Sequence, residues 1–378
     1  MASSLSSPPT PATAPDTSTS KSVRLFSFGS NSLGQLALGH VDDAHTPSPV
    51  LLPPVLPTDI TIVAGGNHTF LLSHAQKVIH ATGDNAFGQC AVPPQSTPTK
   101  TFTPVPPPSP TAYWTSVSAG WQFSILLSSD GNLYACGNGP RGELGLGESI
   151  TTSPTPTLIP SFLPPDVTVV QLASSVEHTL VLVSDGTVYG WGNGRKGQLG
   201  TLPTGEKHLW RPTKLQINLP DFHVAGIAAG RDFSAFISRS GVVHVIGSDK
   251  WSVITSNLTA TSKVADCRVF SAGWGAIYVL RRDGTVVSWG RNTHGQLPPE
   301  GMPPLDSMAV GSEHAVAVGR DGKLYAWGWG EHGNCGPLEG KREVVKSVQE
   351  VKLGEGEYRV EGIAAGCATS WVWASEVD

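Results

Sequence analysis

Three histidines, His68, His178 and His314, occupy the same place in the related segments "GGNHTF", "SVEHTL" and "GSEHAV". Imidazoles at equivalent positions could bind one metal ion if they faced a common axis. These three belong to the first, third and sixth of seven copies of a segment, which argues against convergence on one ion. We instead expect them to tie strand backbones together within their own repeat units, and we predict no metal site.

The carboxylates and thiols of the repeats also lack the pairing that catalysis needs. Cys90 and Cys335 replace a leucine of the repeat and Cys136 replaces a tryptophan, which is typical of core positions. Asp-Gly between two apolar runs is typical of a β-hairpin turn rather than of an acid–base pair. We therefore predict no catalytic or cofactor-binding residue, and a chain that is not an enzyme. The Asp-Gly turns contain Asp130, Asp185, Asp283 and Asp321.

Glycine recurs five times in "VYGWGNGRKGQLG" (188–200), a density also found in phosphate-binding loops. A phosphate-binding loop leads into a helix, but this segment leads into a loop that contains prolines. Similar segments recur along the chain, so we assign the glycines to turns with positive φ and to close strand packing. The seven copies are 26–36, 80–90, 134–144, 189–199, 244–254, 287–297 and 325–335.

A second segment of the type "AAGRDFSAFISRSG" alternates with the first and also occurs seven times. Each unit contains a strand that ends in a tight turn and a second strand that ends at W-G, with no helical periodicity of useful length. Seven such units predict an all-β fold, a single seven-bladed β-propeller. The spacing of the first glycines shortens at the fifth and sixth copies of the first segment, which are therefore the short ones.

The two ends of the chain complement each other. Residues 23–29 form a W-G-type strand without a preceding hairpin, and the last copy stops before its own W-G strand. We expect residues 23–29 to complete the last blade beside residues 359–374, so that pairing of the N- and C-terminal strands closes the ring. The domain prediction is a disordered tail rich in Pro, Ser and Thr at 1–22 and a propeller at 23–378.

The composition fits a soluble protein and excludes several classes. The net charge is −5, which argues against a large basic surface for nucleic acid. No apolar run reaches the length of a membrane span, and the N-terminus does not resemble a secretory signal. Five cysteines without a C-x-x-C pair fit reduced thiols in the cytosol or nucleus. We expect a cytoplasmic protein, with the nucleus as the alternative location.

The pattern W-G-x-N-x-x-G-Q-L-G, alternating with A-G-x-x-H-S/T-x-x-L, resembles the regulator of chromosome condensation repeat over residues 23–374. The resemblance implies a seven-bladed propeller. The family includes the exchange factor for the GTPase Ran, ubiquitin ligases and a bacterial β-lactamase inhibitor, so the fold alone does not assign a function.

Compactness, the absence of additional domains and the acidic balance make the chain most similar to the compact fungal α-tubulin suppressor or killer-toxin-insensitivity propeller. That resemblance implies a heterodimer with a small zinc- or iron-binding protein of diphthamide synthesis. The pair would support diphthamide formation on elongation factor two and Elongator-dependent modification of wobble uridines in tRNA, with Elongator as an indirect partner. It implies no cofactor, no direct DNA binding and no membrane association.

Positions at which the copies differ are not required by the fold, and they are candidates for partner binding. Equivalent turns of a ring lie on one face, where exposed tryptophan and arginine resemble interface anchors. The alternatives are that Trp121 and Trp274 pack between blades, and that the irregular fifth copy has decayed without gaining a function. The predicted partner-binding residues are Trp121, Arg231, Asp232, Asp249, Lys250, Trp251, Trp274, Glu313 and Trp329.

Two other functions stay open at this point. A guanine-nucleotide exchange factor for a Ran-like GTPase is the main alternative, although the first 20 residues hold no Lys or Arg for chromatin docking. An enzyme with a site at the mouth of the central channel would need convergent polar groups in the axial turns, and the repeats supply no such set.

Overall fold

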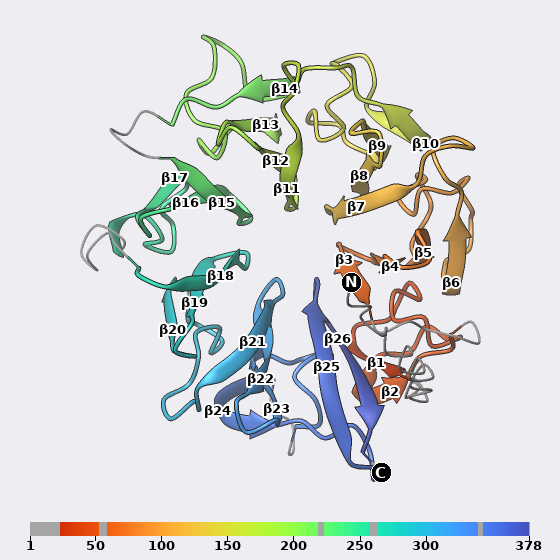
Figure 1. Ribbon diagram of the computed structural model, residues 1–378, viewed down its shortest axis with the longest axis vertical. Coiled ribbons are helices and arrows are strands. Elements are labelled where there is room, and N and C mark those ends of the chain that lie inside the picture. The colour runs from red at the N-terminus through yellow and green to blue at the C-terminus, as the bar shows by residue number, and fades with distance from the viewer. Residues whose placement is uncertain (1–22, 53–58, 218–222, 257–263, 339–342, 378) are drawn as a thin grey trace, which may run out of the picture.

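Seven antiparallel sheets form a ring around a central axis (Figure 1). The turns nearest this axis line a depression, the mouth of the channel. The computed structural model describes residues 23–52, 59–217, 223–256, 264–338 and 343–377. The all-β, seven-bladed propeller predicted from the repeats is therefore confirmed. The predicted tail at 1–22 lies outside the described residues. No helix within the described ranges is long and apolar enough to cross a membrane.

The strands of each blade follow one another outward from the channel, and we call them the inner, second, third and outer strands. The first two complete blades are β3 (Ile60–Ala64), β4 (His68–Ser73), β5 (Val78–Gly83) and β6 (Thr99–Val105), then β7 (Trp114–Ala119), β8 (Phe123–Ser128), β9 (Leu133–Asn138) and β10 (Thr152–Leu158). The other two are β11 (Val169–Ser174), β12 (His178–Val183), β13 (Val188–Asn193) and β14 (His208–Lys214), then β21 (Leu305–Val310), β22 (His314–Gly319), β23 (Leu324–Trp329) and β24 (Val344–Glu350).

Two neighbouring blades have three strands each within the described residues. They are β15 (Val224–Ala229), β16 (Phe233–Ser238) and β17 (Val243–Gly247), then β18 (Cys267–Ala272), β19 (Ala276–Arg281) and β20 (Val286–Gly290). They correspond to the fifth and sixth copies of the first segment, the two short ones. The shortened spacing in the sequence therefore coincides with the two blades in which the described residues form three strands rather than four.

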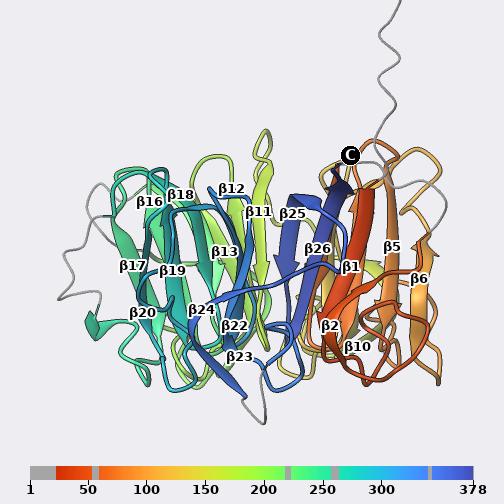
Figure 2. The ribbon, with the colours of Figure 1, turned by 90° about the horizontal axis from the view of Figure 1, so that it is seen from below.

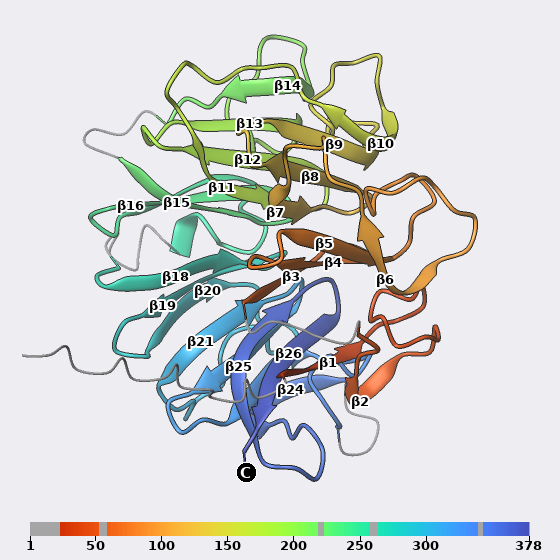
Figure 3. The ribbon, with the colours of Figure 1, turned by 45° about the vertical axis from the view of Figure 1, so that its right-hand side comes forward.

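The last blade is built from both ends of the chain (Figure 3). Strand β1 (Val23–Gly29) pairs with β26 (Thr369–Glu376) from Val23–Ser375 to Gly29–Thr369, and β2 (Ala44–Pro49) and β25 (Tyr358–Ala365) flank this pair. The predicted closure by residues 23–29 is therefore confirmed. We call this sheet the closing blade.

The core consists of the interfaces between blades rather than of one central cluster. In β12, Val181 and Val183 pack with Phe123 of the preceding blade, whereas Leu180 and Leu182 pack with Phe236 of the following blade. Both faces of this strand are therefore buried, which explains why its sequence is continuously apolar instead of alternating. The second strands of all seven blades occupy such a position.

The ring has two different faces, which are seen from the side in Figure 2. Turns from inner to second strands, and loops that follow third strands, lie at one end of each blade; we call this the site face. Turns from second to third strands lie at the other end, which we call the hairpin face. Gly186 has a φ of +84° in one of these turns, and Asp185 accepts the amide of Thr187 (2.8 Å) there, as expected of a hairpin turn.

Candidate functional site

The repeat histidines connect neighbouring blades, which corrects the expectation that they act within their own units. The Nε2 atoms of His68, His178 and His314 lie 2.8, 3.0 and 2.9 Å from serine Oγ atoms on the second strand of the next blade. The sequence could not reveal this contact, because each pair is separated by 56 residues. The serines are Ser124, Ser234 and Ser370.

Each serine hydroxyl also donates to a carbonyl of the histidine's own blade, as Ser234 does to Gln198 (2.6 Å). The hydroxyl must then accept a hydrogen bond from the imidazole, so the proton of His178 lies on Nε2. Burial lowers the pKa of His68, His178 and His314 to about 4, since it disfavours the charged imidazolium. The described residues contain no group of three potential metal ligands.

Backbone amides connect the blades around the mouth of the channel on the site face. Arg231 N–H donates to Trp274 O (3.1 Å), Trp274 N–H to Ser312 O (2.8 Å), and Ser312 N–H to Gly366 O (3.1 Å). The glycines of the A-G turns permit this approach: a Cβ on Gly311 would lie 2.5 Å from the Gly366 carbonyl oxygen. The axial turns are thus held together by backbone contacts, and a side chain at the position of Gly311 would disturb them.

Trp121 and Trp274 meet at this mouth. They belong to well-separated blades of the ring, yet their ring centroids are 5.9 Å apart, and both line the depression around the axis. Trp121 remains 39% exposed. The two rings therefore contact each other at the channel mouth. Trp274 also contacts Arg231 of the adjacent blade, so for this residue the alternative interpretation, packing between blades, still stands.

Six of the nine predicted residues line one pocket of about 240 Å³ on the site face, between blades β15–β17 and β18–β20. We call it the interblade pocket. In the sequence these residues belong to four separate copies of the two segments, and the fold brings them together. They are Arg231, Asp232, Lys250, Trp251, Trp274 and Glu313, joined by Phe233, Ser248 and Arg291.

Cations cover the tryptophan rings of the pocket. The Arg231 guanidinium lies 5.1 Å from the centroid of Trp274. Trp251 has the Lys250 ammonium at 4.8 Å and the Arg291 guanidinium at 4.7 Å. Such cation–π contacts hold long side chains in place without neutralising them.

Arg291 is the structural centre of the pocket. Its Nη1 donates to Glu313 Oε1 (2.5 Å), and Gln296 Nε2 donates to the other carboxylate oxygen (2.6 Å). Glu313 is buried, with 6% exposed, so its two hydrogen bonds compensate for the lost hydration. Glu313 therefore fixes Arg291 against Trp251, which is a positioning role.

Asp249 has a structural role in the loop beside the pocket. Its Oδ1 accepts the amide of Ile254 (2.7 Å), just as Asn31 Oδ1 accepts that of Leu36 (3.0 Å) in the closing blade. Ser252 occupies the position of the second glycine and adopts a positive φ of 56°. The fifth copy thus keeps the turn of the other copies despite its different residues.

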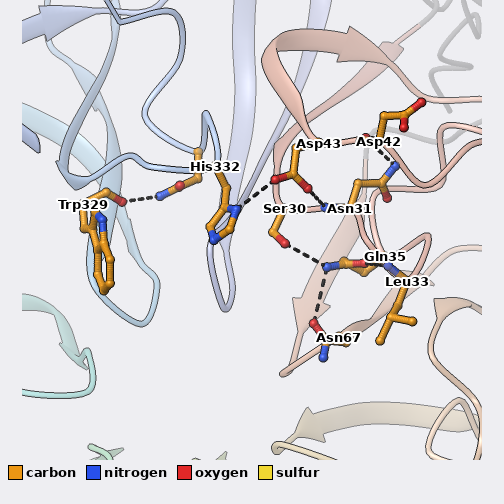
Figure 4. A network of polar contacts seen from close by, with 10 residues as sticks. Ser30, Asn31, Leu33, Gln35, Asp42, Asp43, Asn67, Trp329 and His332 are labelled. Atoms are coloured by element: carbon orange, nitrogen blue, oxygen red, sulfur yellow. Dashed lines mark hydrogen bonds and ion pairs between the residues drawn. The ribbon is translucent and has the colours of Figure 1, made fainter. Parts of the chain in front are cut away.

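Trp329 lies outside the pocket, and its ring stacks on His294 with centroids 4.7 Å apart. His294 Nδ1 lies 3.3 Å from Arg291 Nη2, so Trp329 is connected to the pocket through two residues. A polar network links the blade of Trp329 to the closing blade, where His332 Nδ1 lies 2.8 Å from Asp43 Oδ2 (Figure 4).

The same network continues to the first complete blade. Gln35 Nε2 donates to Ser30 Oγ (3.4 Å) and reaches Asn67 Oδ1 (3.5 Å) (Figure 4). On the site face, polar contacts therefore connect the closing blade with both of its neighbouring blades.

Arg291 and His294 were missed from the sequence. Arg291 follows the glycine of W-G, as Trp329 does, and most copies have a small or polar residue there. The variation that singled out Trp329 could therefore have found Arg291. No comparable signal marks His294, whose contact with Trp329 crosses from one blade to the next.

Fold and site together define a seven-bladed propeller with an aromatic and cationic pocket between two short blades. The chain belongs to the RCC1-like domain family, whose model matches residues 24–372. The RCC1 repeat-containing protein C10F6.04 of Schizosaccharomyces pombe is 28% identical over 375 residues, which are 93% of this chain and 99% of that protein. The secretion-regulating guanine nucleotide exchange factor of Bos taurus is 27% identical over 295 residues, 72% of this chain and 61% of that protein.

Solved structures share the architecture. The crystal structure of Prp20p from Saccharomyces cerevisiae, described with its binding properties to Gsp1p and histones, has a TM-score of 0.79. It is 23% identical, and the match covers 95% of this chain and 93% of that one. Human WBSCR16 has a TM-score of 0.77 and 21% identity, with 95% and 100% of the two chains covered. At this identity the likeness shows the fold.

Proposed function

We propose that the chain is a non-catalytic, protein-binding propeller that forms a heterodimer with a small zinc- or iron-binding protein of diphthamide synthesis. The convergence of six variable residues in one pocket carries the protein-binding part of this proposal. Half-buried tryptophans beside arginine are typical anchors of protein interfaces. The choice of partner is supported by the resemblance to the compact fungal propeller, which rests on the compactness and the acidic balance of the chain and not on a particular motif.

The mechanism that we propose is steric and electrostatic. The site face would hold the small protein and control its access to larger assemblies, in diphthamide formation and in Elongator-dependent tRNA modification. A specific pair of this kind buries roughly 1,600 Å² in total, so its footprint would extend from the interblade pocket over the channel mouth. We propose a cytoplasmic location, with the nucleus as the alternative.

A second candidate is guanine-nucleotide exchange on a Ran-like GTPase. It is favoured by the fold shared with Prp20p, whose structure was described with its binding to Gsp1p, and by the partial similarity to the secretion-regulating exchange factor. An exchange assay on a purified Ran-type GTPase separates the two candidates, because only this function accelerates nucleotide release.

Affinity capture followed by mass spectrometry tests the proposal. The baits are wild type, a Trp121→Ala/Trp274→Ala variant, and Arg268→Gln as a control on the hairpin face. We expect a small cysteine-rich metal protein and Elongator subunits with wild type and the control, and their loss with the double variant. Capture of a Ran-type GTPase and histones instead would refute the proposed partner. Capture of the small protein by all three baits would support the proposed partner but would refute binding through the two tryptophans of the site face.

A further inference from the structure

We infer that the interblade pocket is a receptor for a carboxylate side chain, so that the partner presents an acidic segment to the site face. This inference rests on the proposed protein-binding function and names the chemistry that the partner offers there. It is based on which of the charged groups that line the pocket have an ion-pair partner and which do not.

Three cations and two carboxylates line the pocket, which leaves it with a net positive charge of one. Arg291 and Glu313 neutralise each other through their hydrogen bond. Asp232 lies beside Arg231 in the chain and has no ion pair within the described residues. Arg231 and Lys250 likewise have no carboxylate partner there, although the whole chain carries a net charge of −5.

Tryptophan contacts hold both unpaired cations in place. Arg231 lies over Trp274 and Lys250 over Trp251, so their positions are set before any ligand arrives. In a cation–π contact the cation is attracted to the face of the aromatic ring. The N–H groups of the guanidinium or ammonium that do not point toward the ring remain able to donate hydrogen bonds. Those donors are available for an anion, and binding it requires little further ordering of the side chains.

The pocket is large enough to receive a side chain of the partner. A volume of about 240 Å³ accommodates a carboxylate side chain. Phe233 and the Glu313–Arg291 pair form part of its wall. An aspartate or glutamate of the partner would thus be partly removed from water, where charge-assisted hydrogen bonds are strong.

The same geometry disfavours single-stranded nucleic acid. Proteins bind single strands by stacking bases on open aromatic faces. Trp251 is in contact with Lys250 and with Arg291, and Trp274 with Arg231 and with Trp121. A base would have to displace these groups, whereas a carboxylate would bind to them.

A positively charged depression on the hairpin face supplies a matched control. It is lined by Arg239, Arg268 and Arg282 with one carboxylate, Asp266, but no tryptophan lines it. Arg268 and Arg282 are exposed, as Arg231 and Lys250 are, so all four can be replaced by glutamine with little effect on folding. If positive charge alone attracted acidic peptides, both faces would bind them equally.

The test measures binding of fluorescent peptides to the full chain by anisotropy at low and at physiological salt. The probes are a short alternating Gly-Glu peptide, its Gly-Gln counterpart and an oligouridine of the same length. We expect saturable binding of the Gly-Glu peptide alone. Arg231→Gln and Lys250→Gln should each weaken it about fivefold to tenfold, the loss of one charge-assisted hydrogen bond, and Arg268→Gln should leave it unchanged.

Three results would overturn the inference: no saturable binding of the Gly-Glu peptide, an equal loss in Arg268→Gln, or binding of oligouridine that Arg231→Gln abolishes. These outcomes are independent of the capture experiment. If the peptide binds as expected but no small metal protein is captured, the acidic receptor stands and the proposed partner fails. If the metal protein is captured as expected but the peptide gives one of these three results, the partner stands and the receptor fails.

Discussion

Buried imidazoles at the blade interfaces make stability depend on pH. His68, His178 and His314 remain neutral in the folded state down to a pKa of about 4, whereas an unfolded histidine takes up a proton below about 6.5. Between these values the unfolded state binds more protons, so the free energy of unfolding decreases as the pH falls. Each histidine accounts for about 2 kcal/mol of this loss at pH 5.

Replacement of His178 by glutamine tests this explanation. We expect the variant to be less stable than wild type at neutral pH, because the hydrogen bond to Ser234 changes. Its loss of stability between neutral pH and about pH 5 should be about 2 kcal/mol smaller than that of wild type. Urea unfolding at both pH values measures the difference, with the exposed His74→Gln as the control for removing an imidazole. An unchanged pH dependence would show that His178 is not a source of it.

Sequence variation located most of the pocket but could not assign roles within it. Arg231, Lys250, Trp251 and Trp274 differ from their counterparts in other copies, and the structure places them together. Asp249 also differs from its counterparts, but it performs the turn contact of the usual asparagine. A carboxylate and an amide oxygen accept the same backbone hydrogen bond, so the sequence alone cannot separate structural substitution from functional change.

At the scale of elements, the second glycine of several W-G loops packs against the outer strand of the next blade. This holds for Gly34, Gly88, Gly142 and Gly333. Gly88 has a φ of +87°, and a Cβ there would overlap the carbonyl of Pro154 in β10. Gly88→Ala should therefore destabilise the fold by roughly 3 kcal/mol or more, since it adds backbone strain to a clash.

Ser252 provides the opposite case. It has a positive φ of 56°, and the next blade, β18–β20, has no outer strand within the described residues to contact it. Ser252→Gly should stabilise the protein by about 1 kcal/mol, because glycine adopts this conformation without a steric cost. Thermal unfolding of both variants measures these effects. A destabilised Ser252→Gly, or a wild-type-like Gly88→Ala, would contradict this account of the loops.

The elements themselves were largely predictable, because each repeat encodes its strands locally. Asp-Gly turns, W-G strand ends and the shortened copies all correspond to features of the blades. Contacts between blades were not predictable in detail. The hydrogen bond from Trp191 Nε1 to Glu143 O (2.8 Å) joins residues 48 apart, and nothing in either segment specifies the other.

At the scale of the whole molecule, closure depends on β1. Its seven residues pair with β26 along their full length, and β2 pairs with its other edge. A chain beginning at residue 30 would lose β1 and expose two strand edges, so we expect it to aggregate or to associate between chains. A chain beginning at residue 22 keeps β1 and serves as the control. Size-exclusion chromatography distinguishes them; a monomeric, folded product of the first truncation would refute the closure argument.

The whole molecule also presents two faces of different character. The site face combines tryptophans with positioned cations, whereas the depression between the same two blades on the hairpin face is lined by arginines without tryptophan. We therefore expect protein partners to approach the ring from the site face. Crosslinking from each face in turn tests this prediction, because it reports the side of approach whichever residues the partner uses.

The most direct measurement is site-specific photo-crosslinking in the full chain. A photoreactive residue replaces Lys250 on the site face or Arg282 on the hairpin face, and the adducts are identified by mass spectrometry. We expect an adduct with a small cysteine-rich metal protein from position 250 and none from position 282. An adduct from position 282 alone, or a GTPase as the species captured at position 250, would refute the proposed face or the proposed partner.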